Sequence, residues 1–263
     1  MLTIIVCIKQ VYDPEMPLSL FQLTEDGKLI PPPGTPPVLS TFDENALEAA
    51  LRIKDVQAAK ITIISLGDKL AKPVLRKTLA AGADELILLE DAQFAELDSY
   101  GTAYVLAQAI ERHGLPDMIL CGRQAVDTDA GQVGIGLAER LQIPSVTLAC
   151  QVEVNGERIV VERISGDGME TVALAKPALV TVSQEIGALR YPPVKALMAA
   201  KKMDITILSA ADLGLAAMIP QRVHLQRMFV PQRNKSDCQM ISDAGPEEIA
   251  QRLGEVLIRT LKA

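Results

Sequence analysis

The chain has 263 residues, of which 49% are hydrophobic and 22% are charged, with a formal net charge of −7. This is the composition of a globular protein, and it excludes a disordered or collagen-like chain. The acidic balance, the lack of Trp and the small number of Tyr and Phe argue against a nucleic-acid-binding protein.

The first 141 residues alternate predicted strands with predicted helices. Continuous apolar runs predict strands over residues 2–8, 60–66, 85–89 and 117–121. Helical spacing and capping signals predict helices over residues 41–55, 68–82, 99–114 and 131–141. Thr41 is the expected N-cap of the first helix, with Glu44 completing a capping box, and Asp68 is the expected cap of the second. Residues 18–30 are expected to form an inserted hairpin.

Residues 145–183 change the pattern and are rich in predicted strands. These strands cover residues 145–154, 157–164, 170–175 and 178–182, with a hairpin signal at Asn155 and Gly156. We expect them to extend the same sheet in antiparallel fashion. The fold class is therefore a doubly wound, mostly parallel α/β sheet of the Rossmann-like, adenine-nucleotide-binding kind, with this β extension.

The predicted α/β domain covers residues 1–213, closed by a short helix at 194–201 and a strand at 205–208. Residues 214–263 form the second expected part. They show no periodicity before Pro246, which begins a last amphipathic helix. That helix needs a surface to pack on, which is either its own domain or a partner subunit.

The loop at residues 121–136 is the most informative candidate site. It lies between the end of a predicted strand and the start of a helix, where ligands of open α/β sheets bind. Gly131 and Gly134 allow close approach of a phosphate to helix amides, although the order of the glycines is not that of a dinucleotide fingerprint. Asp127 and Asp129 would cap the helix or bind a ribose. The alternative is an acidic capped loop without a ligand.

Other candidate residues have simpler explanations. Asp43 and Glu44 are a possible carboxylate pair, but helix capping explains them better than catalysis. Lys9 could bind a phosphate, but a surface salt bridge is the simpler role. Cys7 and Cys121 are expected to be buried thiols in a reducing cytoplasm. The sequence shows neither a catalytic triad pattern nor the spacing of metal ligands. No apolar run reaches the roughly 20 residues of a membrane span, so membrane insertion is not expected.

Several motifs resemble the β subunit of electron transfer flavoproteins, in the same order along the chain. The matching segments are residues 6–11, 42–50, 79–84, 122–127 with 131–134, 190–191 and 212–214. The resemblance implies a heterodimer with an α subunit, which holds most of one FAD. It implies an electron carrier and not an enzyme, working with acyl-CoA-type or other flavin dehydrogenases and a quinone-linked oxidoreductase. It also implies a second nucleotide, either AMP or, in electron-bifurcating members, a second FAD.

The resemblance carries functional residues over to this sequence. The implied nucleotide pocket comprises Cys7, Ser40, Thr41, Phe42, Asp43, Leu66, Arg123, Gln124, Ala125, Val126, Asp127, Thr128, Asp129, Ala130, Gly131, Gln132, Val133 and Gly134. The implied docking segment at residues 190–202 includes Arg190, Tyr191, Val194 and Lys201.

The residues of the loop at 121–136 do not decide between AMP and a second FAD. Ala130 stands where bifurcating members tend to carry Thr, which removes a hydroxyl from the phosphate, whereas Arg123, Gln124 and residues 132–134 read as in the bifurcating members. AMP is the expected ligand and a second FAD is the alternative. A stand-alone adenine-nucleotide sensor of the same fold is the hypothesis from another functional class.

Overall fold

The structure is a computed structural model that describes residues 1–25, 27–215, 218–226, 228–229, 238, 240–242 and 245–261. The chain divides into two compact units, Met1–Arg227 and Met228–Ala263. The first unit carries the sheet and the cavity described below.

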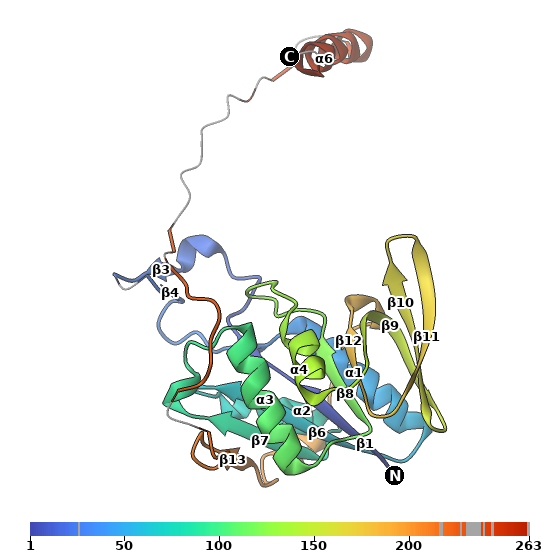
Figure 1. Ribbon diagram of the computed structural model, residues 1–263. Helices are drawn as coiled ribbons and strands as arrows, with labels where there is room; N and C mark the ends of the chain where they lie inside the picture. The colour runs from blue at the N-terminus through green and yellow to red at the C-terminus, as the bar shows by residue number, and fades with distance from the viewer. Residues whose placement is uncertain are drawn as a thin grey trace. The chain divides into compact units, whose positions relative to one another are not determined.

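Within the described residues, the first unit is built on a sheet of nine strands (Figure 1). Across the sheet, these strands are β11 (Gly168–Ala175), β10 (Arg158–Ser165), β9 (Ser145–Asn155), β12 (Ala178–Val182), β8 (Met118–Gly122), β1 (Leu2–Cys7), β6 (Ala59–Gly67), β7 (Glu85–Glu90) and β13 (Thr206–Leu208). In this spatial order, every pair of neighbours from β9 through β12, β8, β1, β6 and β7 to β13 is parallel. The pairs β9–β10 and β10–β11 are antiparallel. The predicted mostly parallel α/β sheet is confirmed.

One part of the strand prediction is wrong. The segment at 178–182 was expected in the antiparallel extension, but β12 lies between β8 and β9 and is parallel to both. All five residues of β12 are buried, so this strand belongs to the centre of the sheet. The antiparallel extension therefore consists of β9 to β11.

Helices cover both faces of the sheet. They are α1 (Thr41–Val56), α2 (Lys72–Ala81), α3 (Ser99–His113), α4 (Val133–Leu141) and α5 (Val194–Ala200), with the short 3-10 helices η1 (Leu18–Leu20), η2 (Ala92–Phe94) and η3 (Gln184–Ile186). α1 and α2 lie on one face, and α3 and α4 lie on the other (Figure 1). Alternate residues of each strand point to opposite faces, so Ile4 and Val6 join the first hydrophobic cluster while Ile5 and Cys7 join the second.

The segment between β1 and α1 contains two small antiparallel sheets. β2 (Gln10–Val11) pairs with β5 (Val38–Leu39), and β3 (Gln22–Leu23) pairs with β4 (Leu29–Ile30). The second pair confirms the hairpin predicted within residues 18–30. The first pair brings the end of β1 close to the start of α1, where the site lies.

Three expected helix caps are wrong. Ser40, and not Thr41, is the N-cap of α1: its backbone is extended, and its carbonyl accepts the first helical hydrogen bond from the Glu44 amide (3.0 Å). Ala71 replaces Asp68 as the N-cap of α2. α4 begins after Gln132, so neither Asp127 nor Asp129 caps it. Capping residues depend on where the chain enters the helix, and tertiary contacts decide that position.

The second unit contains α6 (Pro246–Leu261), which begins at the predicted proline. Its apolar residues Leu253, Leu257 and Leu261 are exposed. No helix in the described part of the chain is both long enough and apolar enough to cross a membrane.

Candidate functional site

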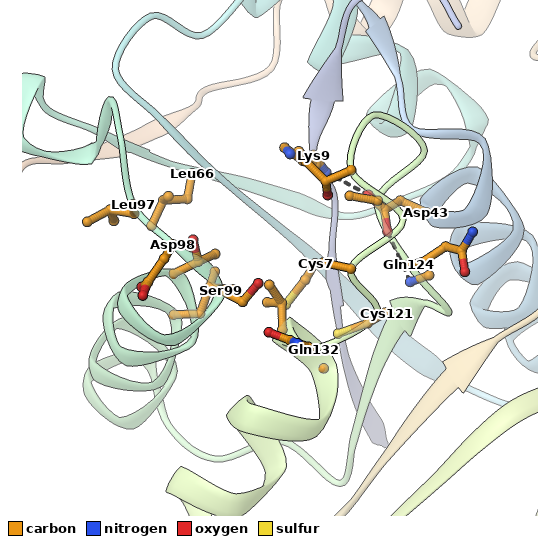
Figure 2. A pocket seen from close by; sticks show the side chains of 18 of the residues that line it. Cys7, Lys9, Asp43, Leu66, Leu97, Asp98, Ser99, Cys121, Gln124 and Gln132 are labelled. Carbon is orange, nitrogen blue, oxygen red and sulfur yellow. Dashed lines mark hydrogen bonds between the residues drawn. The ribbon is translucent and has the colours of Figure 1, made fainter. Parts of the chain in front are cut away.

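A cavity of about 860 Å3 lies at the carboxyl ends of β1, β6 and β8. Figure 2 shows its two sides: Asp43, Cys121 and Gln124 on one, and Leu97, Asp98 and Ser99 on the other. This is the edge of the sheet where open α/β folds bind ligands, because the connections after parallel strands diverge there. The cavity is within the size range of pockets for small organic ligands.

The structure brings most of the predicted pocket residues to this cavity. Those on its wall are Cys7, Asp43, Leu66, Arg123, Gln124, Ala125, Thr128, Ala130, Gly131, Gln132, Val133 and Gly134. Those that do not line it are Ser40, Thr41, Phe42, Val126, Asp127 and Asp129. Phe42 packs against a wall residue, because the guanidinium of Arg123 lies 5.1 Å from the centre of the Phe42 ring.

The two aspartates of the loop after β8 are occupied by neighbouring side chains. Asp127 forms an ion pair with Lys9 (2.7 Å), which confirms the salt bridge expected for that lysine. Asp129 accepts a hydrogen bond from the Gln124 side-chain amide (2.7 Å). Both carboxylates are thus held by other groups, and neither lines the cavity where it would repel an anion.

The start of α4 offers hydrogen-bond donors to the cavity. Val133 and Gly134 line the cavity in the first turn of α4, where backbone amides have no intrahelical carbonyl to bind. Gly131 precedes them with a φ of 62°, a conformation that glycine adopts without strain. The positive end of the helix dipole adds to the attraction for an anion. This end of the cavity is therefore suited to a phosphate group.

Asp43, on the cavity wall, joins three elements. This buried residue of α1 accepts hydrogen bonds from the Lys9 amide after β1 (2.8 Å) and from the Gly122 amide at the end of β8 (3.0 Å). Burial raises the pKa of Asp43 to about 7, and the two amide bonds offset only part of this effect. The carboxylate is positioned to hold two strand ends together, a contact that the capping interpretation did not predict.

Asp43→Asn is expected to remove a pH dependence of stability. Because the pKa of Asp43 is raised, the folded chain retains a proton between about pH 4 and pH 7 that the unfolded chain releases. The free energy of unfolding should therefore fall as the pH rises through this window, by about 3 kcal/mol for this group. Urea unfolding of both proteins from pH 5 to pH 8 should show the stability of the native chain declining relative to that of the variant.

Asp117→Asn provides the matched control. Asp117 accepts hydrogen bonds from the amide and hydroxyl of Thr3, which outweigh its burial and lower its pKa. Its contribution to stability is therefore lost only in more acidic solution. The difference in free energy of unfolding between this variant and the native chain should stay constant from pH 5 to pH 8. A constant difference for Asp43→Asn as well would contradict the assignment.

Cys7 and Cys121 are register partners on adjacent parallel strands, and both line the cavity. Both thiols are free and buried. Hydrogen bonding with Cys7, together with burial, raises the pKa of the Cys121 thiol well above its usual value. The Cys121 thiol is therefore neutral, and both side chains are buried, as expected from the sequence.

Sequence reasoning missed one side of the cavity. The connection from β7 to α3 contributes Phe94, Leu97, Asp98 and Ser99, and a late segment contributes residues 222–223. The position of the first group at the end of a parallel strand was a usable signal, since such connections meet at one edge of the sheet. Residues 222–223 lie in a stretch without periodicity, and no sequence pattern placed them here.

The predicted docking residues do not line the cavity. Tyr191, Val194 and Lys201 are exposed, with Tyr191 88% and Val194 73% accessible. Arg190 instead binds two acidic residues of α1, Glu48 (3.0 Å) and Asp55 (2.8 Å). These hydrogen bonds raise the pKa of Arg190, and they lower the pKa of Glu48 although burial alone would raise it.

Comparison with known proteins identifies the family. Residues 34–213 match the model of the electron transfer flavoprotein domain. The chain is 41% identical to the electron transfer flavoprotein subunit beta of Thermoanaerobacterium thermosaccharolyticum, over 81% of this chain and 80% of that protein. It is 35% identical to the subunit of the same name from Megasphaera elsdenii, over 97% of both chains.

A third relative is named as a subunit of a reductase complex. The chain is 37% identical to the caffeyl-CoA reductase-Etf complex subunit CarD of Acetobacterium woodii, over 81% of this chain and 80% of that protein. Together with the α/β sheet and the cavity at its carboxyl edge, these matches agree with the resemblance seen in the sequence motifs. The chain therefore belongs to the β-subunit family of electron transfer flavoproteins.

Proposed function

We propose that this chain pairs with an α subunit to form an electron transfer flavoprotein, in which it completes one wall of the FAD site and holds a structural AMP in its own cavity. The complex would carry electrons from flavin dehydrogenases of the acyl-CoA type to a quinone-linked oxidoreductase in the cytoplasm. The flavin would supply the reversible uptake of electrons. The observation that carries the proposal is the cavity of about 860 Å3 at the start of α4, in a member of this family.

The cavity wall has the chemistry that an adenine nucleotide requires. Leu66, Phe94 and Leu106 provide apolar surface for a purine. The first-turn amides of α4 would bind the phosphate, and Arg123 adds a positive charge to the same wall. Lys9 also lines the cavity, but its ammonium group is paired with Asp127.

A second FAD in the same cavity is the other candidate, and the extent of the cavity favours it. The wall continues from the strand ends to Leu97, Tyr100 and residues 222–223. AMP has fewer than half the non-hydrogen atoms of FAD, and FAD contains the same adenosine phosphate unit. Either ligand can therefore place its adenosine phosphate unit at the α4 end of the cavity. Only FAD would also fill the rest of the cavity.

The exposed segment after Arg190 would contact the electron-donating partner. Tyr191 and Val194 present apolar surface to solvent, and Lys201 lies exposed after the end of α5. Exposed tyrosines such as Tyr191 are typical anchors of protein interfaces. Arg190, held by α1, would fix the position of this segment.

The domain boundary remains a proposal as well. Residues 1–213 would form the nucleotide-binding domain, and residues 214–263 would form an arm. Residues 222–223 of this arm line the cavity, and its final helix would pack on the α subunit. The exposed apolar residues of α6, which include Leu253 and Leu257, support this assignment, because a helix with such a face gains stability by burying it.

The nucleotides released by denaturing the purified heterodimer test the proposal. Mass spectrometry should find one FAD and one AMP per heterodimer, whereas two FAD would establish the second candidate. A chain that remains a monomer and binds ATP would instead support a stand-alone nucleotide sensor. The absence of any purine nucleotide beyond one FAD would contradict a nucleotide site in this cavity.

A matched pair of variants at Gly131 tests where the phosphate binds. Asn and Asp both tolerate the positive φ of this residue, and an added Cβ lies in ordinary contact, 3.4 Å from the nearest backbone oxygen. Gly131→Asp places a negative charge beside the first turn of α4, whereas Gly131→Asn does not. We expect the Asp variant to bind AMP at least tenfold more weakly than the Asn variant in calorimetry. Equal affinities would contradict a phosphate at this position.

A further inference from the structure

The segment at residues 218–223 packs against α3 and forms part of the cavity wall. Ile219 is buried, and the carbonyl oxygen of Pro220 lies so close to Gly101 that a Cβ there would be only 3.1 Å away. Arg222 and Val223 line the cavity. These residues are part of the compact unit Met1–Arg227.

One carboxylate holds this segment in place. Asp98, the N-cap of α3, accepts a hydrogen bond from the Gly101 amide (2.7 Å) through one oxygen. Its other oxygen accepts from the amides of Arg222 (2.6 Å) and Val223 (2.8 Å). Burial alone would raise the pKa of Asp98, but these three amide bonds outweigh it and lower the pKa. Asp98 is thus ionised at neutral pH and connects α3 with residues 222–223.

Arg222 also brings a positive charge to the cavity. Its guanidinium lies 5.0 Å from the centre of the Tyr100 ring, and the guanidinium of Arg140 lies 4.4 Å from the same ring. Within the described residues, neither arginine forms an ion pair with a carboxylate. Of these two arginines, Arg222 lines the cavity. In an acidic chain, a guanidinium there without a carboxylate partner favours an anionic ligand.

We propose that residues 219–223 are a ligand-binding wall of the nucleotide cavity, that Asp98 is the residue that positions this wall, and that a bound adenine nucleotide stabilises the segment. The proposal rests on the function proposed above for its choice of ligand. A ligand that contacts the segment only in its docked position shifts the equilibrium towards that position.

Hydrogen exchange on the 263-residue chain, freed of nucleotide and then supplied with AMP or FAD, tests this inference. We expect AMP to slow exchange of the Arg222 and Val223 amides at least tenfold, since both are donors to Asp98 in the docked segment. Asp98→Asn should speed exchange of these amides and weaken AMP binding about tenfold.

Asp91→Asn is the matched control. Asp91 also caps a short helix, η2, through the Gln93 amide (3.0 Å), and it also accepts from a distant amide, that of Ala210 (3.1 Å). It does not line the cavity. This variant should therefore leave both the affinity for AMP and the protection of residues 222–223 unchanged.

A second variant keeps the test independent of any folding defect in Asp98→Asn. Arg222→Gln keeps the backbone amide that donates to Asp98 and changes only an exposed side chain. The amide of residue 222 should therefore still be protected by AMP, whereas the affinity for AMP should fall several-fold. If AMP binds but protects neither amide, and both variants bind it like the native chain, the inference is overturned and the nucleotide site stands. If neither AMP nor FAD binds to the native chain, the proposed nucleotide site fails as well.

Discussion

Gly122→Ala should lower the free energy of unfolding by about 3 kcal/mol, because the site has no room for a methyl group. A Cβ at this position would lie 2.5 Å from the carboxylate oxygen of Asp43 and 2.7 Å from the backbone carbonyl carbon of Phe42. Two of the groups that would have to move are backbone atoms of α1, so the strain is not relieved by turning a flexible side chain. The substitution would also lengthen the hydrogen bond from the Gly122 amide to Asp43.

Chemical denaturation of this variant, compared with Gly136→Ala, provides the measurement. Gly136 lies in α4, and a Cβ there would make ordinary contact with Ala103 at 3.4 Å. Since Ala is favoured over Gly inside a helix by about 1 kcal/mol, the control should be neutral or slightly more stable than the native chain. A Gly122→Ala protein as stable as the control would show that the end of β8 and the start of α1 are not packed as described.

Glu48→Ala should cost about 2 to 3 kcal/mol, because it removes the main acceptor for Arg190. The Glu48 side chain is only 7% exposed, and its oxygens accept from the Arg190 amide (3.0 Å), from two guanidinium nitrogens of Arg190 (3.1 and 3.0 Å) and from Arg52 (3.2 Å). Without it, the Arg190 amide would have no acceptor among the residues that the structure describes. Asp55 would still hold the guanidinium from its exposed side.

The control for this prediction is Glu170→Ala, which removes an exposed partner of Arg163. That ion pair spans 3.5 Å, and the Glu170 side chain is 49% exposed, so its loss should change stability by less than about 1 kcal/mol. Glu48→Gln, which keeps an acceptor oxygen, should fall between the native chain and Glu48→Ala. Equal stability of the Glu48→Ala and Glu170→Ala proteins in denaturation would contradict an anchoring role for Glu48.

The local pattern of the sequence determined the fold class and most element positions. The continuous apolar runs at residues 2–8 and 60–66 predicted buried parallel strands, and β1 and β6 are parallel neighbours in the sheet. The helices predicted over residues 68–82 and 99–114 have glycines as their last residues, and Gly82 and Gly114 occupy the C-cap positions of α2 and α3. These features were predictable because hydrophobic periodicity and helix ends depend on residues close together in the chain.

Part of the candidate site followed from the same reasoning. The loop after β8 and the start of α4 had to meet other strand ends, since parallel strands place their carboxyl ends at one edge. The cavity is found there, with Arg123, Gly131 and Gly134 on its wall. The family motifs suggested Ser40, Thr41 and Val126 as well, but these three do not line the cavity.

Only the tertiary structure decided how the polar groups are paired and which strand lies at the centre of the sheet. Asp43 binds the Gly122 amide 79 positions away, and Asp98 binds the Arg222 amide 124 positions away. β12 enters the sheet between β8 and β9 after three strands have intervened in the chain. Each of these contacts depends on the packing of elements that are distant in sequence, and neither periodicity nor local propensity encodes which distant group will be the partner.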